Sequence, residues 1–596
     1  MQNSPQPDSQ GPHGALPGFI AVNREDSPGD NMFGPRDRVT TFLCGQVKMV
    51  SWGLNSLSPS TPTLALSRVI RTQRGQVSPA EIVAGMQHDP TSLTRLLPPF
   101  AAVRGDASGV TMVADSMGFR QLYHSAVEGG GVPILSTSAL FAGWTCGAAL
   151  DQTAVAVQSL LGWQLGQRTL LEGVEKLAPG ATARIAADGV SVGAGAVTAG
   201  PAIALDEAVA RAALLLRASL EALLDEHPDA VLQLTGGQDS RLLLSAIPPA
   251  RRRGLRAMTL GVPGSGDVTV SRRIAERYGL THDVHGLAAL NGMAADEAWR
   301  LVQDAAMRLD GMSDPIALAA LDVAEGSFDQ GVRISGLGGE IARGFYYMGT
   351  VRDRAFTRQD AERLAAWRMF VNEAVEPGLL DEEFSHWARE AANQEVASAL
   401  SATGDEWFRA TDELYLRHRM QRWAGVTDTA VGSRRVVINP MLDAEFVSIA
   451  SRLAPKDKAR SRFLARLQME LDPELGRLPL EGRPAPIAAA YPSGWRSATG
   501  VIGTGRRMAR KAAQRIGQGN RAPAGGAVLA GKVVQHWRRH PELMSVVESS
   551  PFVRPDWIDG VIHSRIEPRP SSVAFLTNLI VASVSRVPRG DRAEVR

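Results

Sequence analysis

VLQLTGGQDSRLLL, residues 231–244, runs from an apolar segment through two glycines and an acidic residue into a second apolar segment. This pattern indicates a buried strand, a tight turn and a helix. Gly236 and Gly237 have no Cβ, so consecutive backbone N–H groups could face an anion at the positive N-terminal end of the helix. Asp239 would repel a phosphate there unless Mg²⁺, which binds carboxylates together with phosphate oxygens, lay between them. On its own, the stretch suits an ordinary strand-to-helix turn as well as a pyrophosphate loop.

The segments around this stretch predict the order of the fold. A long amphipathic helix is expected at 204–227, and a further strand and helix at 256–262 and 268–279. This β-α-β-α order predicts a parallel sheet with helices on its faces. From about 41 to 200, short apolar runs alternate with glycine turn signals, which is typical of antiparallel sheets. The expected fold class is therefore α/β, with a layered α+β domain first and a parallel-sheet domain with many helices second.

The composition is that of a globular protein too long for a single core. Of 596 residues, 44% are apolar and 21% are charged, and the net charge of +2 gives no general attraction to nucleic acid. Two cysteines, Cys44 and Cys146, are too few for a disulfide framework. No apolar run is long enough to span a membrane, and the first seventeen residues lack the features of a signal peptide. We expect a cytoplasmic protein with neither membrane nor nucleic-acid partners.

Four blocks of sequence carry a family resemblance. TGGQDS resembles the SGGxDS pyrophosphate loop of the N-type ATP pyrophosphatases, and specifically of the asparagine synthetase family. The blocks at 256–285, 333–347 and 437–458 resemble that family's second strand and helix, its SGEGxDExxGGY loop and its PFLD helix, in the same order. The resemblance implies a synthetase domain that uses ATP and Mg²⁺ to activate a carboxylate as an acyl-adenylate.

The resemblance also implies roles for individual residues. Asp239 and Glu340 would hold Mg²⁺, with Glu340 at the family's aspartate position. The nucleotide would contact Leu234, Leu260, Ser335 and Gly336, and the pyrophosphate would lie against Thr235, Gly236, Gly237 and Ser240. Arg241 either adds positive charge near the phosphates or lies on the helix surface, and Arg343 is near the second loop in sequence. Asp267 is expected to cap the helix that follows it.

The N-terminal half resembles the family's Ntn-type glutaminase domain. The segments that show this resemblance are LLPPFAAVRGDASGVTMVADSMGFRQLYH (96–124) and GVEKLAPGATARI (173–185). That domain uses a cysteine directly after the initiator methionine, whereas this chain has Gln2 there. Cys44 is internal and is expected to be a buried apolar residue. We therefore expect an inactive glutaminase-like domain, as in β-lactam synthetase, carbapenam synthetase and lasso-peptide cyclases, where the substrate supplies the amine.

Two further departures bear on the chemistry. Leu337 occupies the family's base position and cannot take a proton, and Glu481 and Arg483 lie where a late catalytic lysine is expected. Arg483 either stabilises charge in catalysis or is a surface arginine. The preferred function is an amide-forming ligase that closes a peptide into a macrolactam, with the peptide or its leader-processing proteins as partners. The alternatives are an ammonia-dependent or partner-fed amidotransferase and a non-catalytic nucleotide-binding partner.

The expected organisation has five parts. They are a flexible arm at 1–40, the inactive glutaminase-like domain at 41–200, the synthetase domain at 201–496, a basic mobile segment at 497–532 and a C-terminal helical part of the synthetase domain at 533–596.

Overall fold

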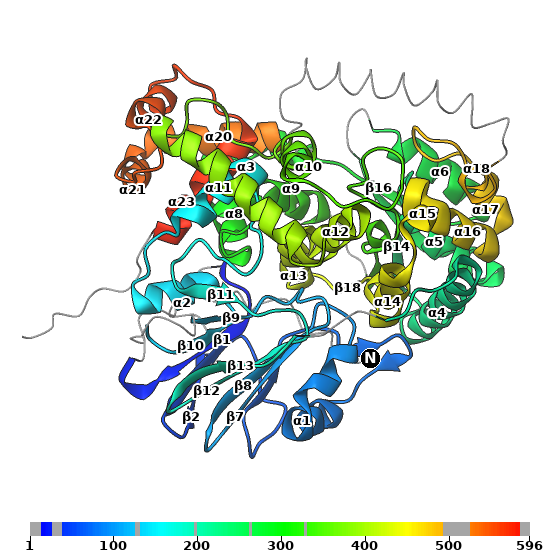
Figure 1. Cartoon of the computed structure of the whole chain (residues 1–596), viewed down its shortest axis with the longest axis horizontal. Helices are drawn as coiled ribbons and strands as arrows, with labels where there is room; N and C mark the ends of the chain where they lie inside the picture. Colours follow the sequence, from blue (N-terminus) through cyan, green and yellow to red (C-terminus); the bar gives the residue numbers. More distant parts are fainter. Residues whose placement is uncertain are drawn as a thin grey trace, which may run out of the picture.

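The computed structural model describes residues 14–26, 39–125, 131–195, 200–261, 265–326, 331–492 and 525–583. Two antiparallel sheets come first, a parallel sheet follows, and helices make up most of the remainder. In Figure 1 the antiparallel sheets lie at the bottom, the parallel sheet and helices α4–α6 at the right, and the C-terminal helices α20–α23 at the upper left. The mixed α/β class expected from the sequence is confirmed.

The antiparallel sheets form the layered domain that the glycine-bracketed apolar runs predict. The six-stranded sheet has the order β11 (Val174–Lys176), β9 (Tyr123–Ser125), β10 (Ile134–Ser136), β1 (Gly18–Asn23), β3 (Val47–Trp52) and β2 (Val39–Cys44). The five-stranded sheet has the order β13 (Gly189–Val192), β12 (Thr182–Ala186), β8 (Gly109–Ala114), β7 (Ala101–Asp106) and β4 (Thr63–Ala65). The short strands β5 (Arg71–Thr72) and β6 (Gly75–Gln76) pair separately.

Side-chain alternation assigns the two faces of each sheet. In β1, Phe19 and Ala21 belong to the core shared with the second sheet, whereas Ile20 and Val22 belong to the core shared with helices. Those helices include α2 (Ala139–Cys146), which packs on β9, β10 and β11. Helix α1 (Pro79–His88) covers β7 through Ile82 and Met86. The layers therefore run helix, sheet, sheet, helix.

Strand β1 shows that the expected flexible arm at 1–40 is wrong over residues 18–23. Both of its edges are paired, with Ile20 opposite Val50 of β3 and Ser136 of β10. The apolar run FIAV is short and lies next to polar, proline-rich sequence, so only its distant partners reveal it as a strand. Residues 1–13 and 27–38 of the expected arm lie outside the described residues.

The parallel sheet has the order β16 (Thr281–His285), β15 (Arg256–Leu260), β14 (Val231–Gln233), β17 (Arg333–Ile334) and β18 (Val437–Ile438). In chain order this is 3-2-1-4-5, so the direction of winding changes between β14 and β17. Helices α4 (Leu205–Glu226), α5 (Asp239–Ala246), α6 (Asp267–Tyr278), α14 (Ala444–Arg452) and α16 (Arg462–Leu471) share one core with the sheet. Ligands of such sheets bind beyond the carboxyl ends of the strands at the change of direction, which makes this edge the first place to look for a site.

A second core forms against α2 and the first sheet, and most of the larger remaining helices contribute to it. The larger ones are α3 (Gln152–Leu161), α8 (Ala295–Arg308), α9 (Pro315–Gly326), α11 (Glu382–Ser401), α20 (Gly526–Arg539), α22 (Pro555–Ile562) and α23 (Pro570–Ser583). Helices α3 and α11 also reach the core of the parallel sheet. The shorter ones are α7 (Ala289–Gly292), α10 (Arg358–Leu364), α12 (Trp407–Leu414), α13 (Val426–Gly432), α15 (Pro455–Lys458), α17 (Pro473–Arg477), α18 (Ile487–Ala490) and α21 (Ser545–Glu548).

Helix α20 corrects the expected mobile segment at 497–532, because it begins at Gly526. Leu529, Val533 and Trp537 recur along it at helical spacing and are buried. The glycines and alanines of this stretch conceal that periodicity in the sequence. Residues 497–524 of the expected segment lie outside the described residues. Among the helices described, none has the length and apolar character needed to cross a membrane.

Candidate functional site

The predicted nucleotide and metal residues meet at the carboxyl ends of β14 and β17. Leu234 and Thr235 follow β14, and Ser335 and Gly336 follow β17, its direct neighbour. Helix α5 begins at Asp239, immediately after the Gly-Gly turn. Leu260 ends the next strand, β15, on the other side of β14. The structure thus gathers residues from three separate sequence blocks at the change of winding direction.

Two glycines let the second loop contact the start of α5. A Cβ on Gly336 would lie 2.9 Å from the backbone nitrogen of Ser240 and 3.0 Å from the carbonyl carbon of Asp239. A Cβ on Gly339 would clash with the Oδ1 atom of Asp239. Any larger residue would push the loop away. The glycines therefore bring Glu340, the next residue, to the Asp239 carboxylate.

Asp239 and Glu340 share one guanidinium group. Arg343 donates to Oδ2 of Asp239 at 3.2 Å and to Oε1 of Glu340 at 2.9 Å. All three side chains are less than a quarter exposed. Burial, and then the nearby Glu340 charge, raise the pKa of Asp239 to about 7, against the opposing effect of Arg343 and Arg483. Burial opposes the charge of Arg343, but the two carboxylates raise its pKa overall.

The other oxygen of each carboxylate fits a hard cation. Oδ1 of Asp239 and Oε2 of Glu340 are buried and have no hydrogen-bond partner within the part of the chain that the structure describes. Buried acceptors without partners are costly, and Mg²⁺ is held through one or two carboxylates together with phosphate oxygens and water. Asp239 and Glu340 therefore fit the role of Mg²⁺ ligands that was predicted for them. Arg343 supplies positive charge to the other oxygen of each carboxylate.

The Gly-Gly turn is held by its own side chains. The backbone N–H of Thr235 donates to Oγ of Ser240 at 3.0 Å, and the N–H of Gly237 donates to Oγ1 of Thr235 at 3.2 Å. The N–H of Gly236 donates to Oδ1 of Asp267 at 2.8 Å. The Asp267 carboxylate forms no cap at its own helix, so that expectation is wrong. A pyrophosphate at this turn would compete with Asp267 for the Gly236 N–H.

A tight turn at 480–483 lies over the Gly-Gly loop. The N–H of Glu481 donates to the carbonyl of Gly236 at 2.9 Å, and its carboxylate accepts from the N–H of Gly266 at 2.7 Å. Arg483 ends the turn with its side chain exposed, and its charge lowers the pKa of Asp239. The structure thus places Arg483 within electrostatic reach of the carboxylate pair.

Arg241 fixes the position of that turn. Its guanidinium is fully buried and donates to the carbonyls of Leu478 at 2.6 Å and Pro479 at 2.9 Å. The expected surface position is therefore wrong: the Arg241 guanidinium is buried and its N–H groups are used on backbone carbonyls. Its partners are more than 230 residues away in the chain, and nothing in the local sequence reveals them.

Leu337, and Lys458 at the end of the 437–458 block, have structural roles. Leu337 is partly buried and packs against the core of the parallel-sheet domain. Lys458, the last residue of α15, donates to Asp412 at 2.8 Å, and Tyr347 donates to the same carboxylate oxygen at 2.8 Å. This buried triad fixes the segment just beyond Arg343 against α12 and α15. No local sequence pattern indicates this contact, because its three residues are far apart in the chain.

The layered domain holds Cys44 as a buried residue, as expected. Burial, and then the Asp106 charge, raise the pKa of its thiol to about 11, which disfavours a nucleophilic thiolate. The residue that leads into β1 is Pro17, and it lines a cavity of ≈ 170 Å³ between this domain and β18 together with Arg68 and Arg120. Gln2 lies outside the described residues.

Comparison with known proteins gives partial structural matches. No protein-family model matches the chain, and no curated protein matches it. It is similar to a glutamine phosphoribosylpyrophosphate amidotransferase from B. subtilis at 11% identity and a TM-score of 0.19, covering 46% of this chain and 60% of that chain. A second match, titled the allosteric regulatory enzyme of purine biosynthesis, has 12% identity and a TM-score of 0.20, covering 54% of this chain and 88% of that one. Similarities this partial show nothing about activity.

Proposed function

We propose that the chain is an ATP-dependent ligase that adenylates a carboxylate and forms an amide with a substrate amine, releasing AMP and pyrophosphate. The observation that carries the proposal is the Asp239–Glu340 pair, with one buried oxygen on each carboxylate left without a partner at the carboxyl ends of β14 and β17. An ordinary strand-to-helix turn has no need of two buried acids that converge from separate loops.

Residues of the chain would bind and orient the phosphates in this scheme. Mg²⁺, when bound, would screen the phosphate oxygens from the carboxylates and stabilise negative charge on the departing pyrophosphate. Arg343 neutralises the opposite oxygens of Asp239 and Glu340, and Arg483 brings a further positive charge on an exposed turn. Such preplaced charge favours the transition state because the protein does not have to reorganise to supply it.

The proposed reaction has two steps, adenylation of the carboxylate and attack by the amine. A substrate carboxylate oxygen attacks the α-phosphorus of ATP, and the bond from that phosphorus to pyrophosphate breaks. The substrate amine then attacks the acyl carbon, the bond to AMP breaks, and the amine proton passes to solvent. Leu337 cannot take this proton, so the scheme relies on holding the amine close to the acyl carbon, an effect that can supply several kcal/mol (roughly 7–11) of the barrier.

The buried Cys44 supports a substrate amine over ammonia produced by the chain. A buried thiol at the end of β2 with a pKa near 11 is poorly suited to glutamine hydrolysis. A peptide that carries both the carboxylate and the amine meets the requirement for proximity, and ring closure to a macrolactam is the preferred outcome.

Product analysis with peptides tests the proposal. Full-length protein is incubated with ATP, Mg²⁺ and short peptides that carry an internal Asp or Glu and a free N-terminus. The expected result is AMP in equal amount to a peptide lighter by one water, with loss of both products in Glu340→Gln. Glu362→Gln removes an exposed carboxylate that pairs with Arg358 and serves as the matched control. Product only with added ammonia would favour the amidotransferase, and ATP binding without AMP release would favour the non-catalytic partner.

A further inference from the structure

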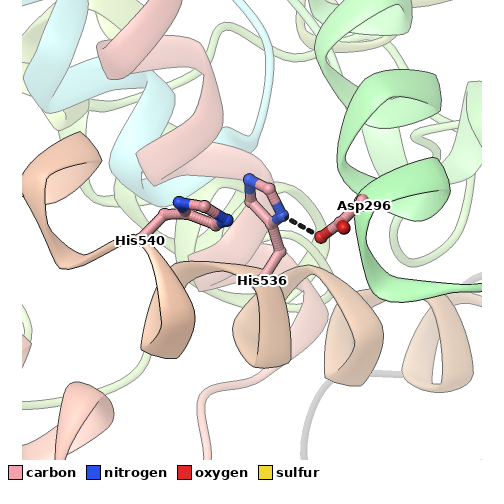
Figure 2. A group of neighbouring side chains, drawn as sticks. All are labelled: Asp296, His536 and His540. Atoms are coloured by element: carbon pink, nitrogen blue, oxygen red, sulfur yellow. Dashed lines mark hydrogen bonds and ion pairs between the residues drawn. The ribbon is translucent and has the colours of Figure 1, made fainter.

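We propose that Asp296, His536 and His540 form a binding site for a divalent transition-metal ion of the Zn²⁺ type. The three side chains come from elements outside the carboxylate-pair site: Asp296 from α8, His536 from α20, and His540 from the residue directly after α20. Figure 2 shows both imidazoles on one side of α20, with Asp296 facing them from the neighbouring helix.

The spacing is that of a metal site. One candidate ligand atom from each residue lies within 4.8 Å of the other two. The histidines are four residues apart, so a helical turn places both rings on the same face, with ring centroids 4.5 Å apart. Nδ1–H of His536 donates to Oδ1 of Asp296 at 2.7 Å. A metal ion would replace that proton and draw in His540. No other trio of His, Cys, Asp or Glu side chains in the described ranges has ligand atoms this close.

The surroundings hold the ligands in place. His536 is 8% exposed, and its ring stacks on Trp299 with centroids 5.7 Å apart and planes 14° apart. Nδ1 of His540 contacts Glu542 at 3.3 Å, an outer carboxylate of the kind that orients ligand imidazoles. The C-terminal end of α20 adds negative potential, which favours a cation. The His536 ring and its contact with Asp296 are therefore in place before a metal binds.

Arg539 is the group that opposes the cation. Its guanidinium lies 3.0 Å from the Asp296 oxygen that His536 contacts, and its side chain is 53% exposed. An exposed ion pair is weak, usually below about 1 kcal/mol, so a bound metal can displace it. The donor set of two imidazoles and one carboxylate suits Zn²⁺ and related ions better than Mg²⁺ or Ca²⁺, which prefer oxygen. Water would complete a four-coordinate site, and the ion would tie α20 to α8.

Zinc titration of the chelator-treated full-length protein tests the proposal. ZnCl₂ is added in competition with a chromophoric chelator, and the melting temperature is followed in parallel. The expected result is one equivalent bound, a rise in melting temperature, and at least a tenfold weaker affinity in both His540→Ala and Asp296→Ala. X-ray absorption is expected to show two imidazole nitrogens in the first shell.

His563→Ala is the matched control, because His563 is exposed and lies 2.8 Å from Asp559 but belongs to no three-residue ligand group among the described residues. It should bind Zn²⁺ like the wild type, and so should Asp239→Asn, which separates this site from the carboxylate pair. Circular dichroism without zinc checks that the variants fold. Absence of zinc binding in the wild type, or wild-type affinity in both ligand variants, would overturn the proposal.

Discussion

Replacing Asp239 with Asn should stabilise the metal-free protein at alkaline pH. The pKa of this carboxyl is raised from 3.8 to about 7 in the folded chain, first by burial and then by Glu340. A group whose folded pKa is raised contributes stability that is complete below pH 4 and is lost as the pH rises through 7. The difference of about 3 pKa units, at about 1.4 kcal/mol each, corresponds to about 4 kcal/mol.

Asparagine mimics the protonated acid and keeps an oxygen that can accept from Arg343. We therefore expect Asp239→Asn to match the wild type near pH 4 and to exceed its stability by about 4 kcal/mol at pH 8. For a domain of roughly 150–250 residues, a gain of about 4 kcal/mol corresponds to a rise of roughly 10 °C in melting temperature. Calorimetry across the pH range measures the difference, and Mg²⁺ should stabilise the wild type at pH 8 and leave the variant unchanged, since the cation binds the ionised carboxylate.

Asp428→Asn provides a matched control. Burial also raises the pKa of Asp428 to about 7, and its carboxylate accepts from Asn439 away from the carboxylate pair. This variant should show the same gain at alkaline pH, while Mg²⁺ should stabilise it as it does the wild type. If Asp239→Asn and the wild type melt alike at every pH, or respond alike to Mg²⁺, the account of the buried pair is refuted.

Three further outcomes are expected. Gly339→Ala should abolish Mg²⁺-dependent stabilisation in a melting assay, because its Cβ would clash with the carboxylate of Asp239. Gly286→Ala, whose Cβ meets no atom within 4 Å, should leave that stabilisation intact. Arg483→Ala should slow pyrophosphate release at least tenfold without lowering the melting temperature, since its side chain is exposed; an unchanged rate would make it a surface residue. A thiol reagent at pH 8 should label the exposed Cys146 and should reach the buried Cys44 only after unfolding. Prompt labelling of both thiols in the folded protein would contradict the burial of Cys44.

Local patterns predicted the centre of the fold well. The apolar run before Gly236 and the helical spacing after it gave the strand, turn and helix, and the following strand and helix gave the parallel sheet. The family resemblance pointed to Asp239 and Glu340, which the structure brings together under Arg343. These features lie in contiguous segments whose periodicity is strong.

Features that depend on distant partners were not predictable. Strand β1 is too short to stand out, and only pairing with β3 and β10 on both sides makes it a buried strand. Arg241 looks like a surface residue until the 475–479 segment supplies carbonyl acceptors for it. Asp267 is expected to cap its own helix, whereas its carboxylate accepts from the N–H of Gly236 in the loop after the neighbouring strand β14. Contacts of this kind require the assembled sheet.

Exchange of labelled pyrophosphate into ATP detects formation of the acyl-adenylate itself. Full-length protein with Mg²⁺ and a peptide carboxylate should catalyse the exchange, because formation of an acyl-adenylate is reversible while the amine is blocked. Asp239→Asn and Glu340→Gln should abolish it, and Glu362→Gln should not. Exchange that persists in both site variants, or ATP and Mg²⁺ binding with no exchange for any carboxylate in a peptide library, would contradict the account.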